Sequence, residues 1–187
     1  MEFKREKEMS KVRKMLGRAD SPGIVALMKQ IETQSKTTIA GWCVQYAGEN
    51  ILPVYEKAYP EDKRPGRALQ AAREFLNGKM KLPAAKAIIR EAQAAAREAE
   101  GNPAAQAAAR AVAQSAAAIH TPTHSLALAF YGAAALAYDR VGTEEAAEVY
   151  DGIAAGEFET MGKALRAVSV ENEPDPAKID WYCGSRE

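Results

Sequence analysis

The chain has 187 residues, of which 47% are hydrophobic and 27% charged, and its 25 basic and 25 acidic side chains cancel to a formal net charge of zero. A chain of this size and composition is expected to fold as one globular domain with its own core. Zero net charge gives no global field that would attract nucleic acid or an acidic membrane surface. No stretch reaches the roughly 18 apolar residues of a membrane-spanning helix, and the N-terminus has no apolar core of signal-peptide length. We therefore expect a cytoplasmic protein that is not membrane bound, with Cys43 and Cys183 as free thiols.

The first 20 residues form a charged segment. The spacing of its apolar residues predicts a surface helix over 2–16, ended by Gly17. Its lysines and arginines raise the alternative of a nucleic-acid-binding arm. Glu2, Glu6 and Glu8 are interspersed among them, however, and phosphate binding needs unopposed positive charge. We therefore expect no nucleic-acid partner.

The next stretch, residues 21–59, predicts three helical segments. Ser21 followed by Pro22 is typical of a helix start, and apolar residues at 24, 27, 28 and 31 give that helix one buried face. Ser35 is expected to cap a second helix. Pro53 lacks a backbone donor and clashes with the preceding turn, so this helix should kink or end near Asn50, and a short helix should follow.

Residues 60–119 predict three more helices joined by short turns. Asp62 is expected to cap a helix that begins near Pro65 and ends near 77. Pro83 opens the next helix, which runs to 100, and Asn102 starts another that reaches about 119. Alanine dominates the last two helices. It has the best helix propensity, and its small side chain lets helix axes approach closely.

Residues 120–187 predict one central helix followed by shorter elements. Thr121-Pro122 is typical of a helix start, and the segment after it is apolar almost all round, which indicates burial. Gly142 ends this helix. Two short helices are then expected, one around Tyr150 and one over about 158–168, before a loop that begins at Ser169.

Together these elements predict an all-α fold, a single-domain helical bundle of about seven to nine helices in antiparallel hairpins with an alanine-rich centre. The expected organisation is a charged N-terminal helix over 1–20, the all-α domain over 21–168 and a C-terminal tail over 169–187. Closely packing alanine-rich helices would also permit a homodimer.

Two clusters of polar residues make up the candidate binding site. The first cluster contains Glu49, Glu56, Asp62, Arg64 and Arg67, and lies around Pro53 and the turn that follows. Its simplest interpretation is a set of surface ion pairs, each contributing about 0–1 kcal/mol. Its functional interpretation is a partner-binding face or a polar pocket. The second cluster is His120 and His124, which we expect to lie beneath the first.

The histidine pair leaves two chemical alternatives open. Two histidines four residues apart could hold zinc, but Pro122 separates them and the sequence has no third histidine, so we expect no metal and no cofactor. A histidine acting as acid or base beside a carboxylate would make the chain an enzyme or a small-ligand-binding protein. Nucleophile elbows, phosphate-binding loops and CxxC pairs are absent from the sequence. No catalytic residue is therefore predicted, and we expect a protein that is not an enzyme.

A pattern of aromatic, proline and charged residues spans 42–78. It resembles the signature of a bacterial family of putative immunity proteins, the five-like immunity domain of polymorphic toxin systems. The residues that carry it are Trp42, Ala47, Glu49, Leu52-Pro53, Tyr55-Glu56, Tyr59-Pro60, Asp62, Arg64-Pro65, Arg67-Ala68, Ala71, Arg73 and Gly78. The similarity continues through the alanine-rich helices and covers roughly residues 36–140.

The resemblance implies a small all-α cytoplasmic protein that binds and neutralises a cognate protein toxin by protein–protein interaction. It supplies no catalytic residues. The sequence departs from the family pattern at Gln45-Tyr46, where members tend to show an acid and a cysteine. No role is therefore carried over to that position.

Overall fold

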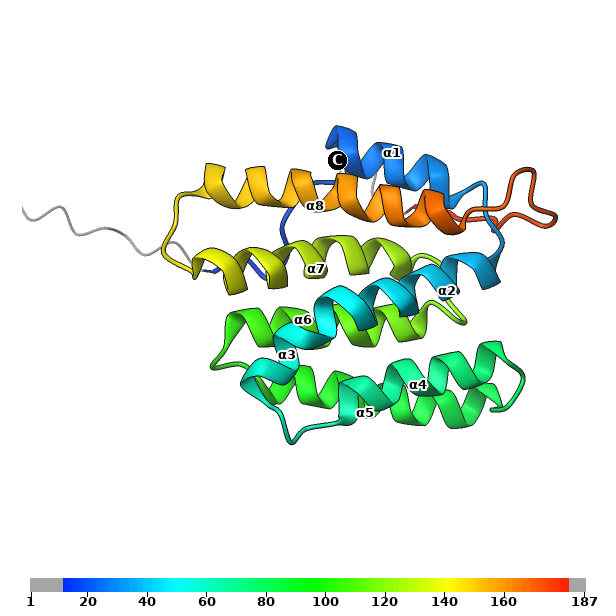
Figure 1. The fold of residues 1–187 in the computed structure, drawn as a ribbon, viewed down its shortest axis with the longest axis horizontal. Helices are drawn as coiled ribbons and strands as arrows, with labels where there is room; N and C mark the ends of the chain where they lie inside the picture. The colour runs from blue at the N-terminus through cyan, green and yellow to red at the C-terminus, as the bar shows by residue number, and fades with distance from the viewer. Residues whose placement is uncertain (1–11, 182–187) are drawn as a thin grey trace, which may run out of the picture.

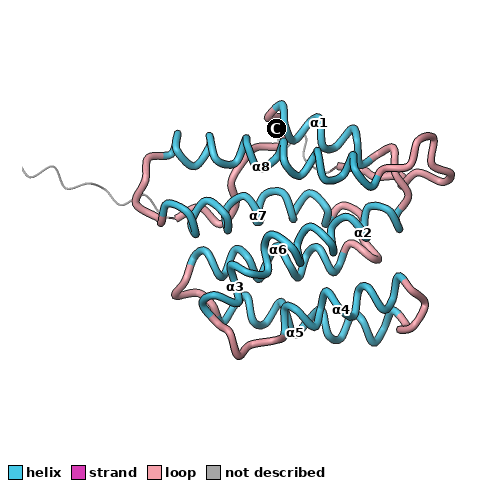
Figure 2. The backbone as a smooth tube through the Cα atoms, in the orientation of Figure 1, coloured by secondary structure: helices cyan, strands magenta, loops and turns pink. Residues whose placement is uncertain are grey.

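The computed structural model of this chain describes residues 12–181, and within that range it contains helices and no strand. Figure 2 shows these helices joined by short loops. The predicted all-α fold class is confirmed, and the number of helices is close to that expected. The elements are α1 (Pro22–Ile31), α2 (Lys36–Tyr46), the π-helical segment η1 (Ala47–Ile51), α3 (Leu52–Ala58), α4 (Arg64–Leu76), α5 (Leu82–Glu98), α6 (Pro103–Ala117), α7 (His124–Val141) and α8 (Ala147–Val168).

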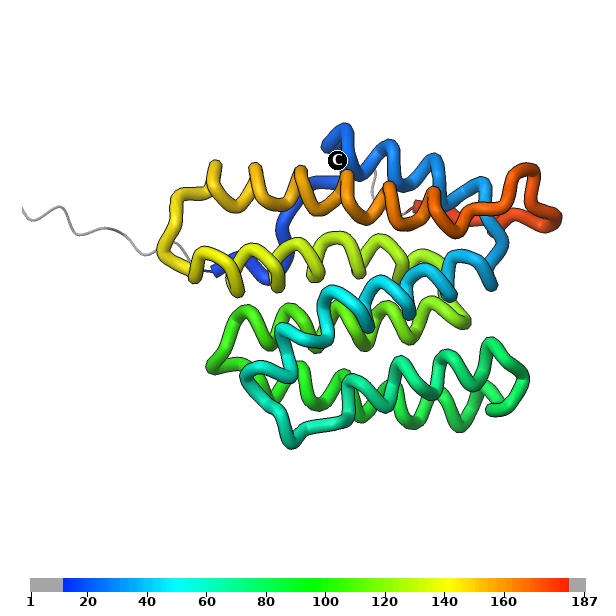
Figure 3. Tube along the Cα trace, viewed as in Figure 1, coloured from blue at the N-terminus to red at the C-terminus, as the bar shows by residue number. Residues whose placement is uncertain are grey.

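The helices form two layers. α5, α6, α7 and α8 follow one another side by side, each antiparallel to the one before (Figures 1 and 3). In the second layer, α4 packs on α5 and α6, the α2–η1–α3 segment packs on α6 and α7, and α1 lies beside α8 (Figure 1). Within the described residues, no helix is long and apolar enough to cross a membrane.

Alanine makes the close contact between the layers possible. α6 lies at the centre, and ten of its 15 residues are buried, eight of them alanines. Gly132 of α7 shows how tight the packing is, because a Cβ there would lie 3.1 Å from Met161 Cε and 3.3 Å from Ile51 Cδ1. Small side chains give up buried apolar area but allow helix axes to approach, so many interhelical contacts fit into a short chain.

Most helix starts follow their sequence signals. The Ser35 hydroxyl accepts the Thr38 backbone N–H at 3.2 Å, and Asn102 Oδ1 accepts the Ala105 N–H at 3.0 Å. The start predicted at Thr121-Pro122 is displaced, because those residues form a turn and α7 begins at His124.

Pro53 interrupts the second helix in a way that keeps the chain helical. The turn before it widens into η1, where the Leu52 N–H bonds to the carbonyl of Ala47, five residues back. The Asn50 side chain donates to the Tyr46 carbonyl at 3.1 Å and so satisfies another backbone acceptor of this turn. The wider turn accommodates Pro53, whose backbone nitrogen cannot donate a hydrogen bond and whose ring would clash with a regular α-helical turn.

The two ends of the chain differ from expectation in detail. The helix predicted over 2–16 lies mostly outside the described residues, and residues 12–16 follow bends without helix. The two short helices expected after Gly142 form one helix, α8. Gly152 and Gly156 are exposed on it and do not interrupt it. Packing of α8 against α1 and α7 outweighs the modest cost of glycine in a helix, about 1 kcal/mol each. The loop predicted after Ser169 is present.

Candidate functional site

The turn between α3 and α4 holds a network of four side chains. Arg64, the first residue of α4, donates to Asp62 through Nε at 3.0 Å and through Nη2 at 2.7 Å. Asp62 also accepts the Arg64 backbone N–H at 3.0 Å and the Tyr55 hydroxyl at 2.7 Å. The same guanidinium donates to the Glu98 carboxylate at 3.1 and 2.6 Å. The network, which we call the Asp62 network, therefore ties α3, α4 and the end of α5 together.

Its electrostatics favour the ionised carboxylate. The Arg64 hydrogen bonds hold the pKa of Asp62 far below its usual range; burial alone would raise it, and the Tyr55 hydroxyl lowers it further. Burial raises the pKa of Tyr55, and the hydrogen bond to Asp62 adds to that rise. Asp62 and Arg64 are therefore both charged near neutral pH, with most of their polar atoms already paired inside the protein.

The other members of the first predicted cluster have separate surroundings. Arg67 forms a 3.4 Å salt bridge with Glu91 of α5. Glu56 is half-buried beside the first turn of α4, and Glu49 is exposed on η1. The structure thus joins Asp62 and Arg64 directly, while the remaining three form no bond to that pair.

The histidine pair lies at the turn between α6 and α7. The rings of His120 and His124 are 6.2 Å apart and nearly perpendicular, and they line a cavity of about 230 Å³ with Lys86 and Arg90 of α5. Neither Nδ1 atom reaches solvent or has a hydrogen-bond partner among the described residues. Burial lowers the pKa of both rings; the Lys86 charge lowers that of His120 further, and His120 does the same to His124. Both imidazoles are therefore neutral at neutral pH.

The Asp62 network and the histidine cavity lie at opposite ends of α5. Glu98 belongs to the Asp62 network and Lys86 to the histidine cavity. At a rise of about 1.5 Å per residue, this stretch of helix separates Lys86 from Glu98 by roughly 18 Å. The histidines therefore do not lie beneath Asp62 and Arg64. The described residues that line their cavity include no carboxylate, which the acid–base alternative requires.

Metal-binding side chains are also scattered. Within residues 12–181, no three His, Cys, Asp or Glu side chains gather closely enough to hold a metal ion. Cys43 is fully buried, and burial raises the pKa of its thiol. Cys183 lies outside the described residues.

The sequence did not point to a polar junction between the C-terminal segment and the start of α2. Glu173 accepts the Ser35 N–H at 2.7 Å, the Ser35 hydroxyl at 2.7 Å and the Thr38 hydroxyl at 2.6 Å. Burial alone would raise the pKa of Glu173, but these donors hold it below its usual value. Ser35 and Glu173 are 138 positions apart, so no local pattern could have paired them.

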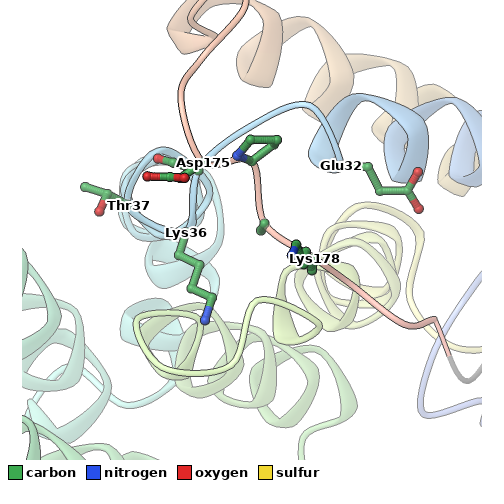
Figure 4. Close-up of a pocket in the computed structure, with 8 residues that line it drawn as sticks. Glu32, Lys36, Thr37, Asp175 and Lys178 are labelled. Atoms are coloured by element: carbon green, nitrogen blue, oxygen red, sulfur yellow. The ribbon is translucent and has the colours of Figure 1, made fainter.

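An open basin of about 740 Å³ adjoins this junction and is lined by residues 32, 35–37 and 175–178 (Figure 4). Figure 4 shows the charged ends of Glu32 and Lys36 pointing away from one another. Glu173 already accepts the Ser35 backbone N–H, and the Ser35 hydroxyl accepts that of Thr38, so these two donors at the start of α2 are not free to hold an anion. The basin therefore offers a wide surface without converging polar groups.

The model of one protein family, described as the Imm-5 like putative immunity protein family, matches residues 29–163. The chain belongs to this family. The part of the chain that matches the immunity protein family contains both predicted clusters, whereas Glu173 lies beyond it. No curated protein and no solved structure matches the chain.

Proposed function

We propose that this chain is an immunity-type protein, which binds a cognate protein toxin in the bacterial cytoplasm and neutralises it by contact, without catalysis. The observation that carries the proposal is the family match over residues 29–163, which spans the central two-layer bundle. A bundle with an alanine-packed centre offers a stiff scaffold, and stiff partners lose little entropy on binding.

The seven candidate contact residues do not form one surface, so they differ in what they offer a partner. Asp62, Arg64 and Arg67 are already paired within the fold. Lys86 and Arg90, which line the cavity beside His120 and His124, form no salt bridge within residues 12–181 and so remain available to a partner. We therefore place the recognition face on the histidine side of the bundle and assign the Asp62 network to support.

The test is coexpression with the toxin encoded beside this gene in the source organism. We expect the chain to restore growth and to form a complex with that toxin on size-exclusion chromatography. A specific complex would bury about 800 Å² on each partner. Growth that is not restored would overturn the proposal, and so would protection without a complex, because a catalytic antidote needs no stable contact.

A further inference from the structure

A second cavity lies beside that of the histidine pair, along the same helices. The second cavity, of about 210 Å³, is lined by Arg97 of α5, Arg110 of α6 and Tyr131 of α7. Gln93 of α5 lines both cavities, so they adjoin one another. We call these two neighbouring cavities together the basic groove; its basic residues are Lys86, Arg90, Arg97, Arg110, His120 and His124.

Charge is sharply segregated in this part of a chain that is neutral overall. The described residues that line the basic groove include four with permanent positive charge and none that is acidic. The two acids of this part of α5 are engaged elsewhere, Glu91 with Arg67 and Glu98 with Arg64 of α4. The sequence from 101 to 138, which contains α6 and most of α7, has no Asp or Glu at all. The groove therefore carries a concentrated positive field.

The donors in the groove are free to bind. Within residues 12–181, Lys86, Arg90, Arg97 and Arg110 take part in none of the salt bridges. The Arg110 guanidinium lies 5.9 Å from the centre of the Tyr131 ring, which orients it without consuming its hydrogen bonds. Arginine beside tyrosine is the composition that carries most binding energy at protein interfaces.

We propose that the basic groove binds an acidic segment of a protein partner, with the lysine and arginine side chains of α5 and α6 donating hydrogen bonds to carboxylates of that segment. The identity of this partner as the toxin rests on the proposed function; the preference for carboxylates rests on the groove alone. Guanidinium groups bind carboxylates through two parallel hydrogen bonds, which gives the interaction direction as well as strength.

The spacing of the charges suits an extended peptide. Lys86 and Arg90 are one helical turn apart, a rise of about 6 Å, and Arg97 follows about 10 Å further. Alternate side chains of an extended chain recur about every 6.6 Å on one face. An extended segment of about six residues is therefore about as long as the row on α5, and acids two positions apart match the spacing of Lys86 and Arg90. Nucleic acid is less favoured, because Tyr131 is the one large aromatic side chain among the described lining residues, and Arg110 already lies over its ring.

A peptide titration tests the groove directly. The probe is an acetylated and amidated hexapeptide that alternates Glu with Ala, added at low salt to the full chain labelled with ¹⁵N. We expect chemical-shift changes confined to residues of α5, α6 and the first half of α7 that line the groove, and none with the Lys–Ala counterpart. Changes that are absent at millimolar peptide, or that lie on another surface, would overturn the proposal. So would single-stranded mixed-sequence DNA that shifts the same signals at lower concentration than the peptide.

Charge-reversal variants give the matched control. Arg90→Glu with Arg110→Glu should weaken peptide binding by on the order of tenfold or more. Lys79→Glu with Lys163→Glu, which changes net charge equally at exposed sites outside the groove, should leave it unchanged. If the first double variant fails to fold, Arg90→Gln serves in its place. If both double variants weakened peptide binding equally, the peptide would be responding to the net charge of the protein and not to the groove, and the proposal would be overturned.

Coexpression with the toxin separates the two proposals. If the groove variant restores growth and forms the complex as well as the unchanged chain, the basic groove is not the docking site and this inference fails, while the proposed function stands. If the unchanged chain binds the peptide in the groove but neither binds the toxin nor restores growth, the proposed function fails and the groove's preference for carboxylates stands.

Discussion

The Tyr55 hydroxyl and the Arg64 guanidinium both donate at 2.7 Å to the same oxygen, Oδ2 of Asp62. Tyr55 is almost completely buried, so its hydroxyl brings Asp62 into contact with the core while Arg64 connects it to α5. This convergence fixes the geometry of the turn between α3 and α4.

Removing the hydroxyl should weaken this junction. Tyr55→Phe should lower the free energy of unfolding by about 1–2 kcal/mol, because hydrogen bonds to charged groups contribute more than neutral ones. Urea unfolding at neutral pH measures the change. Tyr59→Phe is the matched control, since its ring stacks on Tyr55 at 5.2 Å and its hydroxyl makes no hydrogen bond within the described residues. Equal losses in the two variants would contradict the role of the Asp62 network.

Both the backbone conformation and the packing at position 17 require glycine. Its φ is +92°, and a Cβ there would lie 2.7 Å from Phe158 Cε2, in a buried ring that also packs on Phe130. Gly17→Ala should therefore cost about 2–4 kcal/mol, from the left-handed conformation and from overpacking together.

Gly78→Ala separates these two causes. Gly78 also has a positive φ, +69°, but a Cβ there would meet nothing within 4 Å. Its substitution should cost only about 1 kcal/mol, from backbone conformation alone. Thermal unfolding of both variants compares them, and equal shifts in melting temperature would show that Phe158 moves aside.

The histidines should make stability fall on mild acidification. Folding lowers the pKa of His120 and His124, so below about pH 6.5 the unfolded chain binds more protons than the folded one. The free energy of unfolding should then decrease as pH drops from about 7 to 5. The chain has only these two histidines, so the double variant His120→Gln, His124→Gln should flatten that dependence. An unchanged slope in urea midpoints would contradict it.

Glu173 should contribute to stability as a remote cap. Glu173→Gln should lower the free energy of unfolding by about 1 kcal/mol, the usual contribution of a helix cap. The neutral amide cannot provide the negative charge that the N-terminus of α2 favours. Because folding lowers the pKa of Glu173, its contribution is present above the ordinary value near 4.5 and is lost as pH falls through the lowered one. Glu171→Gln is the control, as Glu171 is exposed and forms no hydrogen bond in the described part of the chain. Urea unfolding of both variants at neutral pH should show the difference.

Local signals in the sequence determined most of the fold. Ser35 and Asn102 stand where helices begin, and each bonds an N–H three residues ahead, so the whole interaction lies within one turn. Alanine content indicated a closely packed centre, and hydrophobic faces gave the α-helical class. Pro53 marked the right place for an interruption, but only the packed structure decided that the chain would widen into η1.

Tertiary structure decided which charges meet. Arg64 pairs with Glu98, 34 positions away, and Glu173 with Ser35, 138 away. The same packing placed the histidines at the far end of α5, with Lys86 and Arg90 beside them and Arg110 in the neighbouring cavity. A helix start depends on neighbours in the chain, so its signal is written locally. The partner of a surface charge depends on how helices stack, and many stackings satisfy the same local pattern.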